Sequence, residues 1–202
     1  MPDPHILLLP DIVLPCLLFP PRAWWQLALV QETVRINTGP PLRNVSYRNR
    51  YRIATGNGPL LLSVPLIGGR RHDAPLAELM TDEGQGWQRR HWRTLFSAYG
   101  RAPFFEYLGP ELEALIMARD MSLAERNLSA IRWMARCMRR TLHIEAVAKV
   151  PEQSAGLYAG LAFGPLPELP PYRQVFDDRH GFIPDLSALD QLMMQGRGAG
   201  DL

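Results

Sequence analysis

The apolar pattern of the chain changes its period near residue 85, and this change constrains the fold more than any other feature. Before it, short segments rich in aromatic and β-branched residues lie between Gly- and Pro-containing turns, which is typical of strands. After it, apolar residues recur at helical spacing. A series of strands followed by a series of helices is typical of α+β domains. We therefore expect an α+β fold in which a mixed sheet of about five strands from the N-terminal half is covered by helices from the C-terminal half.

The expected strands lie in short apolar segments with clear boundaries. A run bounded by prolines predicts a buried first strand at residues 5–9, and a helix is expected at 22–31. Further strands are expected at 34–38 and 76–81. Residues 45–55 and 60–67 flank the Gly- and Pro-rich turn at 56–59, which predicts a β-hairpin.

Helical periodicity predicts three consecutive helices, at residues 85–99, 104–117 and 122–142. In the first, Trp92, Leu95, Phe96 and Tyr99 fall on one arc. In the third, Ser122 is expected as the N-cap, with Glu125 completing a capping box. The rest of the chain predicts a strand at 144–148, a loop to 171, a strand at 172–176 and a last helix at 186–195 that Asp185 caps.

Length and charge limit the broad class. The 202 residues suit a single domain, which we expect at 1–196 with a disordered tail at 197–202. The net charge of +2 argues against a nucleic-acid-binding protein. Of the 22 basic residues only Lys149 is lysine, which reflects either codon bias or a need for arginine. Prolines interrupt the apolar N-terminus, so no membrane span is expected.

The two cysteines, Cys16 and Cys137, are far apart in sequence and have no metal-ligand spacing. They predict free, buried thiols in a reducing cytoplasm, and the sequence predicts neither a metal nor a cofactor. The chain also lacks the GxGxxG, Walker A, GxSxG and HExxH motifs of common nucleotide-binding and hydrolytic sites.

An arginine-rich segment at residues 47–52 is the sharpest local feature. On a strand, alternate side chains share a face, so three arginines would lie on one side and two tyrosines and an asparagine on the other. The arginines form either a solvated outer face or an anion cradle for phosphate or carboxylate. The residues are Tyr47, Arg48, Asn49, Arg50, Tyr51 and Arg52.

Two further groups are candidates for proton transfer. Trp87 and His91 are neighbours on the expected helix, and His91 is either a general acid or base or a satisfied histidine at the edge of the core. Asp190 lies among apolar residues of the last helix. It is either a catalytic carboxylate or, as we favour, the partner of an arginine.

The motifs in this order resemble the WbqC-like protein family. They are LFPP at 18–21, SYRNR at 46–50, NGP at 57–59, LSVPL at 62–66, RHWRTL at 90–95, APFFE at 102–106, YRQVF at 172–176 and GFIPDLSALD at 181–190. The resemblance spans roughly residues 17–196. Members often carry an acidic residue shortly before the second motif, whereas residues 38–44 here contain none.

The resemblance implies a transferase that modifies an amino sugar during assembly of a surface polysaccharide such as O-antigen, by adding an acyl or aminoacyl group such as glycine. The substrate would be a phosphate-bearing sugar or a nucleotide sugar. A non-enzymatic binding or scaffold protein of the same pathway is the alternative. For the transferase we expect catalytic roles for His91, Asn49 and Asp190, and substrate contacts from Tyr47, Arg48, Arg50, Trp87, Arg90 and Tyr99.

Overall fold

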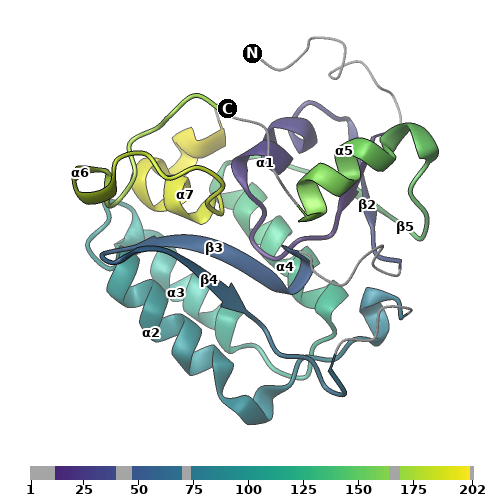
Figure 1. The fold of residues 1–202 in the computed structure, drawn as a ribbon, viewed down its shortest axis with the longest axis horizontal. Coiled ribbons are helices and arrows are strands. Elements are labelled where there is room, and N and C mark those ends of the chain that lie inside the picture. Colours follow the sequence, from purple (N-terminus) through teal and green to yellow (C-terminus); the bar gives the residue numbers. More distant parts are fainter. Residues whose placement is uncertain (1–11, 40–46, 70–73, 164–168, 201–202) are drawn as a thin grey trace.

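The computed structural model describes residues 12–39, 47–69, 74–163 and 169–200. Its five strands form two separate sheets (Figure 1), so the prediction of one mixed sheet is wrong. The first sheet is parallel and has the order β1-β2-β5, with β1 at Val13–Pro15, β2 at Thr33–Asn37 and β5 at His143–Val147. The second is the antiparallel pair β3 (Arg50–Thr55) and β4 (Gly58–Ser63).

Local connections explain both pairings. The chain between β1 and β2 contains α1 (Arg22–Ala28), and a crossover of this kind places two strands parallel. Thr55 and Gly58 pair across a two-residue turn, which forces β3 and β4 to run antiparallel. The hairpin prediction is therefore confirmed, with shorter strands than expected.

The helices at the centre of the chain are confirmed: α2 is Trp87–Tyr99, α3 is Phe105–Met117 and α4 is Leu123–Cys137. The side-chain oxygen of Ser122 accepts from the backbone N–H of Glu125, whose carboxylate accepts from the N–H of Ser122, so the capping box is present. The helix α4 ends earlier than expected because the chain leaves helical geometry at Arg139, which has a φ of +54°.

Figure 1 shows α2 and α3 side by side on one side of the hairpin, with α6 (Asp177–His180) and α7 (Leu189–Gln195) on the other. Both α2 and α7 contact β3. Four fully buried tryptophans lie in the core around these elements: Trp24, Trp25, Trp87 and Trp133. None of the helices in the described ranges is long and apolar enough to cross a membrane.

Several predicted elements are wrong. Residues 76–81 contain a 3₁₀ turn at Leu76–Glu78 rather than a strand, and residues 172–176 are not a strand. The expected loop after β5 contains α5 (Glu152–Phe163), which packs on β1. Its apolar residues form no one-sided stripe, so periodicity did not reveal it. The strand expected at 5–9 lies outside the described residues.

The structure also differs from the predictions for the buried face of α2, the start of α7, the C-terminal residues and the burial of Cys137. On α2 the buried residues include Trp87, His91 and Leu95, whereas Phe96 is 58% exposed. Asp185 does not cap α7, because it lies three residues before Ala188, which is the N-cap. Where a tail was expected, Gly196–Gly200 form a 3₁₀ turn that packs on α7. Both cysteines are free, but Cys137 is only partly buried.

Candidate functional site

The arginine-rich segment does not form one face of a strand. Residues Tyr47–Asn49 are a 3₁₀ turn, and the strand begins at Arg50, so the expected alternation fails at Arg48. The Arg48 side chain is 2% exposed. Its guanidinium donates to the carbonyl oxygen of Gly39 at 2.8 Å, to Asn37 Oδ1 at 2.7 Å and to the hydroxyl of Tyr158. Arg48 therefore joins the end of β2 to α5 inside the core, apart from solvent.

Asn49 fastens the same turn to the end of β4. Its side-chain amide donates to the Val64 carbonyl oxygen at 2.9 Å, and the Val64 N–H donates to the Asn49 carbonyl oxygen at 2.8 Å. Tyr47 is half-buried and packs on the core. These contacts give Asn49 and Tyr47 a structural role in the fold.

His91 is 4% exposed and sits between two aromatic rings. Its Nδ1 atom lies 3.0 Å from the Tyr51 hydroxyl, and its ring contacts Trp87 with centroids 4.9 Å apart. Burial lowers the pKa of His91 to about 4, although a hydrogen bond with the backbone of Ser63 raises it. The imidazole is therefore neutral at pH 7. His91 and Asn49 have different hydrogen-bond partners, Tyr51 and Val64. Arg90, next to His91 in sequence, is exposed.

Asp190 is completely buried in α7, beside the phenols of Tyr99 and Tyr172. Both phenols lie close enough to lower its pKa, although neither makes a hydrogen bond of ordinary length and angle with the carboxylate. Burial outweighs them and raises the pKa of Asp190 to about 7. The ion pair that we favoured is not found, because no described arginine lies within salt-bridge distance of Asp190.

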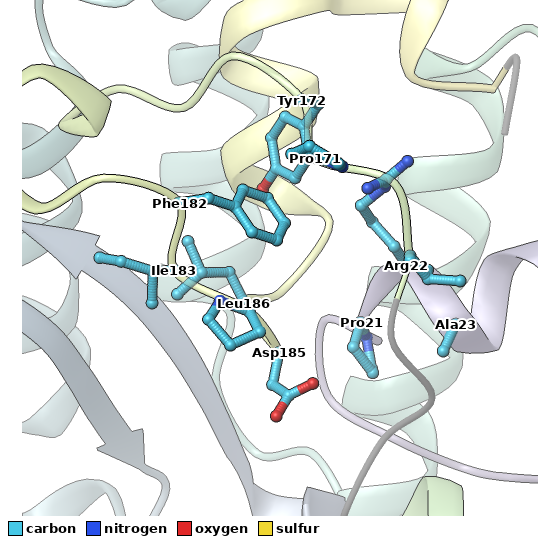
Figure 2. A pocket seen from close by; sticks show the side chains of 11 residues that line it. Pro21, Arg22, Ala23, Pro171, Tyr172, Phe182, Ile183, Asp185 and Leu186 are labelled. Carbon is cyan, nitrogen blue, oxygen red and sulfur yellow. The ribbon is translucent and has the colours of Figure 1, made fainter.

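Tyr172 also lines a cavity of about 280 Å³. Arg22 at the start of α1 and Asp185 in the segment before α7 bring opposite charges to it, and Figure 2 shows these two groups apart from each other at the cavity. The ring of Phe182 meets that of Tyr172 edge to face, with centroids 5.8 Å apart. The lining residues are Pro21, Arg22, Ala23, Leu169, Pro171, Tyr172, Phe182, Ile183, Pro184, Asp185 and Leu186.

Arg22 and Tyr172 hold each other in place at the cavity. The Arg22 guanidinium carbon lies 4.7 Å from the centre of the Tyr172 ring, and its Nη1 atom donates to the Pro170 carbonyl oxygen at 2.7 Å. A cation over a ring face is favourable. The contact with Arg22 therefore helps to fix the aromatic wall of the cavity.

Asp185 adopts a backbone conformation that is rare for a residue with a side chain. Its φ is +63°, a strain that tends to be kept at functional sites. Burial raises the pKa of its carboxyl, and the positive charge of Arg52 opposes that change. The segment is fastened to β3, because the Ser187 N–H donates to the Arg52 carbonyl oxygen at 2.8 Å. The sequence pattern suggests Asp185 only as a helix cap, and no motif points to the cavity.

The described residues contain no cluster of three or more side chains suited to hold a metal ion. No curated protein and no solved structure is similar enough to the chain to be matched. The family model described as "WbqC-like protein family" matches residues 18–161, which is well over half of the chain. The match includes the Arg48 and His91 contacts and Arg22, and it ends before Tyr172 and Asp185. On this match, the chain belongs to the WbqC-like protein family.

Proposed function

We propose that this protein is a cytoplasmic transferase that modifies an amino sugar during assembly of a surface polysaccharide, with the sugar held in the cavity between Arg22 and Asp185. One observation carries the proposal: a small cavity combines an aromatic wall with one carboxylate and one guanidinium. A sugar needs a ring face for its C–H groups and a few well-placed polar partners, and this lining supplies both.

The size of the cavity selects the part of the substrate that it would hold. Its volume of about 280 Å³ lies just below the range of most ligand sites, which span roughly 300–1,000 Å³. This suits one monosaccharide better than a whole nucleotide. Arg22 would hold an oxygen or a phosphate of the sugar, and Phe182 would cover its ring.

Asp185 is the group that we assign to proton transfer. An amine attacks an acyl carbon only in its neutral form, so a carboxylate beside the ammonium can act as the general base that removes a proton. The ammonium first gives one proton to Asp185. The neutral amine nitrogen then forms the new bond to the acyl carbon of the acyl or aminoacyl donor, and the leaving group departs with the electrons of the broken bond and takes up the second proton from the nitrogen. The raised pKa of the Asp185 carboxyl brings it closer to that of a useful base. His91 and Asn49 then maintain the frame on which the cavity is built.

Binding of glucosamine, measured by calorimetry on wild type and on Asp185→Asn, tests this assignment. We expect the substitution to weaken binding by about tenfold, the loss of one charge-assisted contact. Glucose, which has a hydroxyl in place of the amine, should bind weakly to both proteins. Asp178→Asn is the matched control, because it removes the same charge outside the cavity. Equal glucosamine binding by wild type and Asp185→Asn would refute the proposal.

A binding protein of the same pathway is the second candidate. It is favoured by the burial of His91 and by the hydrogen bond that holds the half-buried Asn49 within the fold. Mass spectrometry of glucosamine incubated with the protein and an acetyl or glycyl thioester separates the two. A product whose formation requires Asp185 supports the transferase, whereas Asp185-dependent binding without product supports the binding protein.

A further inference from the structure

A second, open groove of about 1,150 Å³ lies where α2 ends and α6 and α7 approach it. Three arginines from separate segments line it: Arg101 after α2, Arg173 in the segment before α6, and Arg179 within α6. Asp178 is its one acidic lining residue, so the charge of the lining is strongly positive.

The three guanidinium groups have no partners within the part of the chain that the structure describes. All three side chains are exposed, and none makes a hydrogen bond or an ion pair with a described residue. In contrast, Arg35 and Arg119 each pair with a glutamate. Like charges gathered around one groove repel unless an anion lies between them, and arginine forks match the geometry of phosphate.

The groove also offers apolar and aromatic surface beside this charge. Val175, Phe176 and Met194 are partly buried in its lining, and Phe96 at its edge is 58% exposed. An exposed aromatic ring in the same groove as three guanidinium groups favours a flat aromatic group that carries phosphate, because the base can stack while the phosphates are bound.

We propose that this groove binds a nucleoside diphosphate group, with Arg101, Arg173 and Arg179 on the phosphates and the base on Phe96 or Phe176. Binding of a nucleoside diphosphate group in the groove does not depend on the proposed transferase function. Only the identification of that group as the activated part of a second substrate rests on the proposed function.

One chain segment separates the groove from the smaller cavity. Tyr172 lines the cavity and the next residue, Arg173, lines the groove. Gln174 fixes this segment, because its amide donates to the Ile183 carbonyl oxygen at 2.8 Å and accepts from the Ile183 N–H at 2.8 Å. The cavity suits a monosaccharide better than a whole nucleotide, and the groove that Arg173 lines has the excess positive charge that the cavity lacks.

Calorimetric titration with ADP, UDP, inorganic pyrophosphate and adenosine tests the proposal at 150 mM salt, roughly physiological ionic strength. We expect Arg173→Gln/Arg179→Gln to weaken binding of at least one nucleoside diphosphate by about tenfold or more. The matched control is Arg89→Gln/Arg93→Gln, which removes the same charge from exposed positions of α2 outside the groove. The control should change affinity by less than about twofold, and Asp178→Asn should strengthen binding.

Several results would overturn the proposal: no saturable binding of either diphosphate, an equal loss in the control double variant, or pyrophosphate or adenosine binding as tightly as the nucleoside diphosphates. Glucosamine titrations on the same variants keep the two sites distinct. The groove variants should bind glucosamine as wild type does, and Asp185→Asn should bind the nucleoside diphosphate as wild type does. Because the exchanged side chains are exposed, the midpoint of thermal unfolding should stay within a few degrees, which verifies that each variant folds.

Discussion

Replacing Asp190 with asparagine should change the pH dependence of stability between about pH 4 and pH 7 from a shallow profile to one that rises with pH. The native protein holds this carboxyl proton more tightly than the unfolded chain, since burial raises the pKa from 3.8 to about 7. The free energy of unfolding therefore falls as pH rises through this range. Three pKa units correspond to at most about 4 kcal/mol, at about 1.4 kcal/mol for each unit.

His91 acts in the opposite direction over the same range. Burial lowers its pKa from 6.5 to about 4, so the native state keeps it neutral and loses stability as pH falls below 6.5. The two contributions largely cancel in the wild type, which should show a shallow profile. In Asp190→Asn only the His91 contribution is left, and the free energy of unfolding should rise from pH 4 to pH 6.5.

Urea denaturation followed by tryptophan fluorescence at half-unit pH steps measures both profiles, because Trp87 and Trp133 are buried in the native state. Above pH 7 the variant should be more stable than wild type, which then buries an ionised carboxylate. The control Asp178→Asn removes one exposed carboxylate and should keep the wild-type profile. Parallel profiles for wild type and Asp190→Asn would refute the reasoning.

Three glycine and cap substitutions test the packing by the same denaturation assay. Ser122→Ala removes the capping box and should lower the free energy of unfolding by about 1 kcal/mol. Gly196→Ala should cost about 1–3 kcal/mol, because Gly196 has a φ of +56° and a Cβ atom would lie 2.5 Å from the ring of Phe104. Gly156→Ala in α5 should instead stabilise by up to about 1 kcal/mol, since a Cβ atom there has nothing within 4 Å. A destabilised Gly156→Ala or an unaffected Gly196→Ala would contradict these placements.

The parts of the fold that the sequence predicted correctly are those with local causes. A two-residue turn defines the β3–β4 hairpin, and a capping box marks the start of α4. The parallel sheet has no such mark, because it pairs β2 with β5, and Thr33 meets His143 across more than a hundred residues. Periodicity identifies a strand but not its partner, so the expected single sheet from the N-terminal half is wrong and the observed strands form two sheets.

The candidate site shows the same limit. Alternation of side chains along a strand predicts that Arg48 shares a face with Arg50 and Arg52. Residues Tyr47–Asn49 instead form a 3₁₀ turn, and the Arg48 side chain enters the core. The cavity brings Arg22 together with Asp185, which is more than 160 residues away in sequence. No sequence pattern around Arg22 or Asp185 points to the other residue, and only the tertiary fold brings both charges to one cavity.

The motifs of this chain therefore divide into a frame and a ligand-facing segment, and Arg48 tests the division. Arg48→Met removes the donor for the buried Gly39 carbonyl oxygen and one of the two donors for Asn37 Oδ1, which also accepts from the Tyr158 hydroxyl, and should cost at least about 2 kcal/mol. Glucosamine titrations of Arg48→Met at temperatures well below its unfolding midpoint should still give the wild-type affinity. Asp185→Asn should instead bind glucosamine more weakly and keep a free energy of unfolding close to that of wild type. A folded Arg48→Met protein that binds glucosamine tenfold more weakly would contradict the division. Arg48 would then act on the ligand, as its place in the arginine-rich motif first suggested.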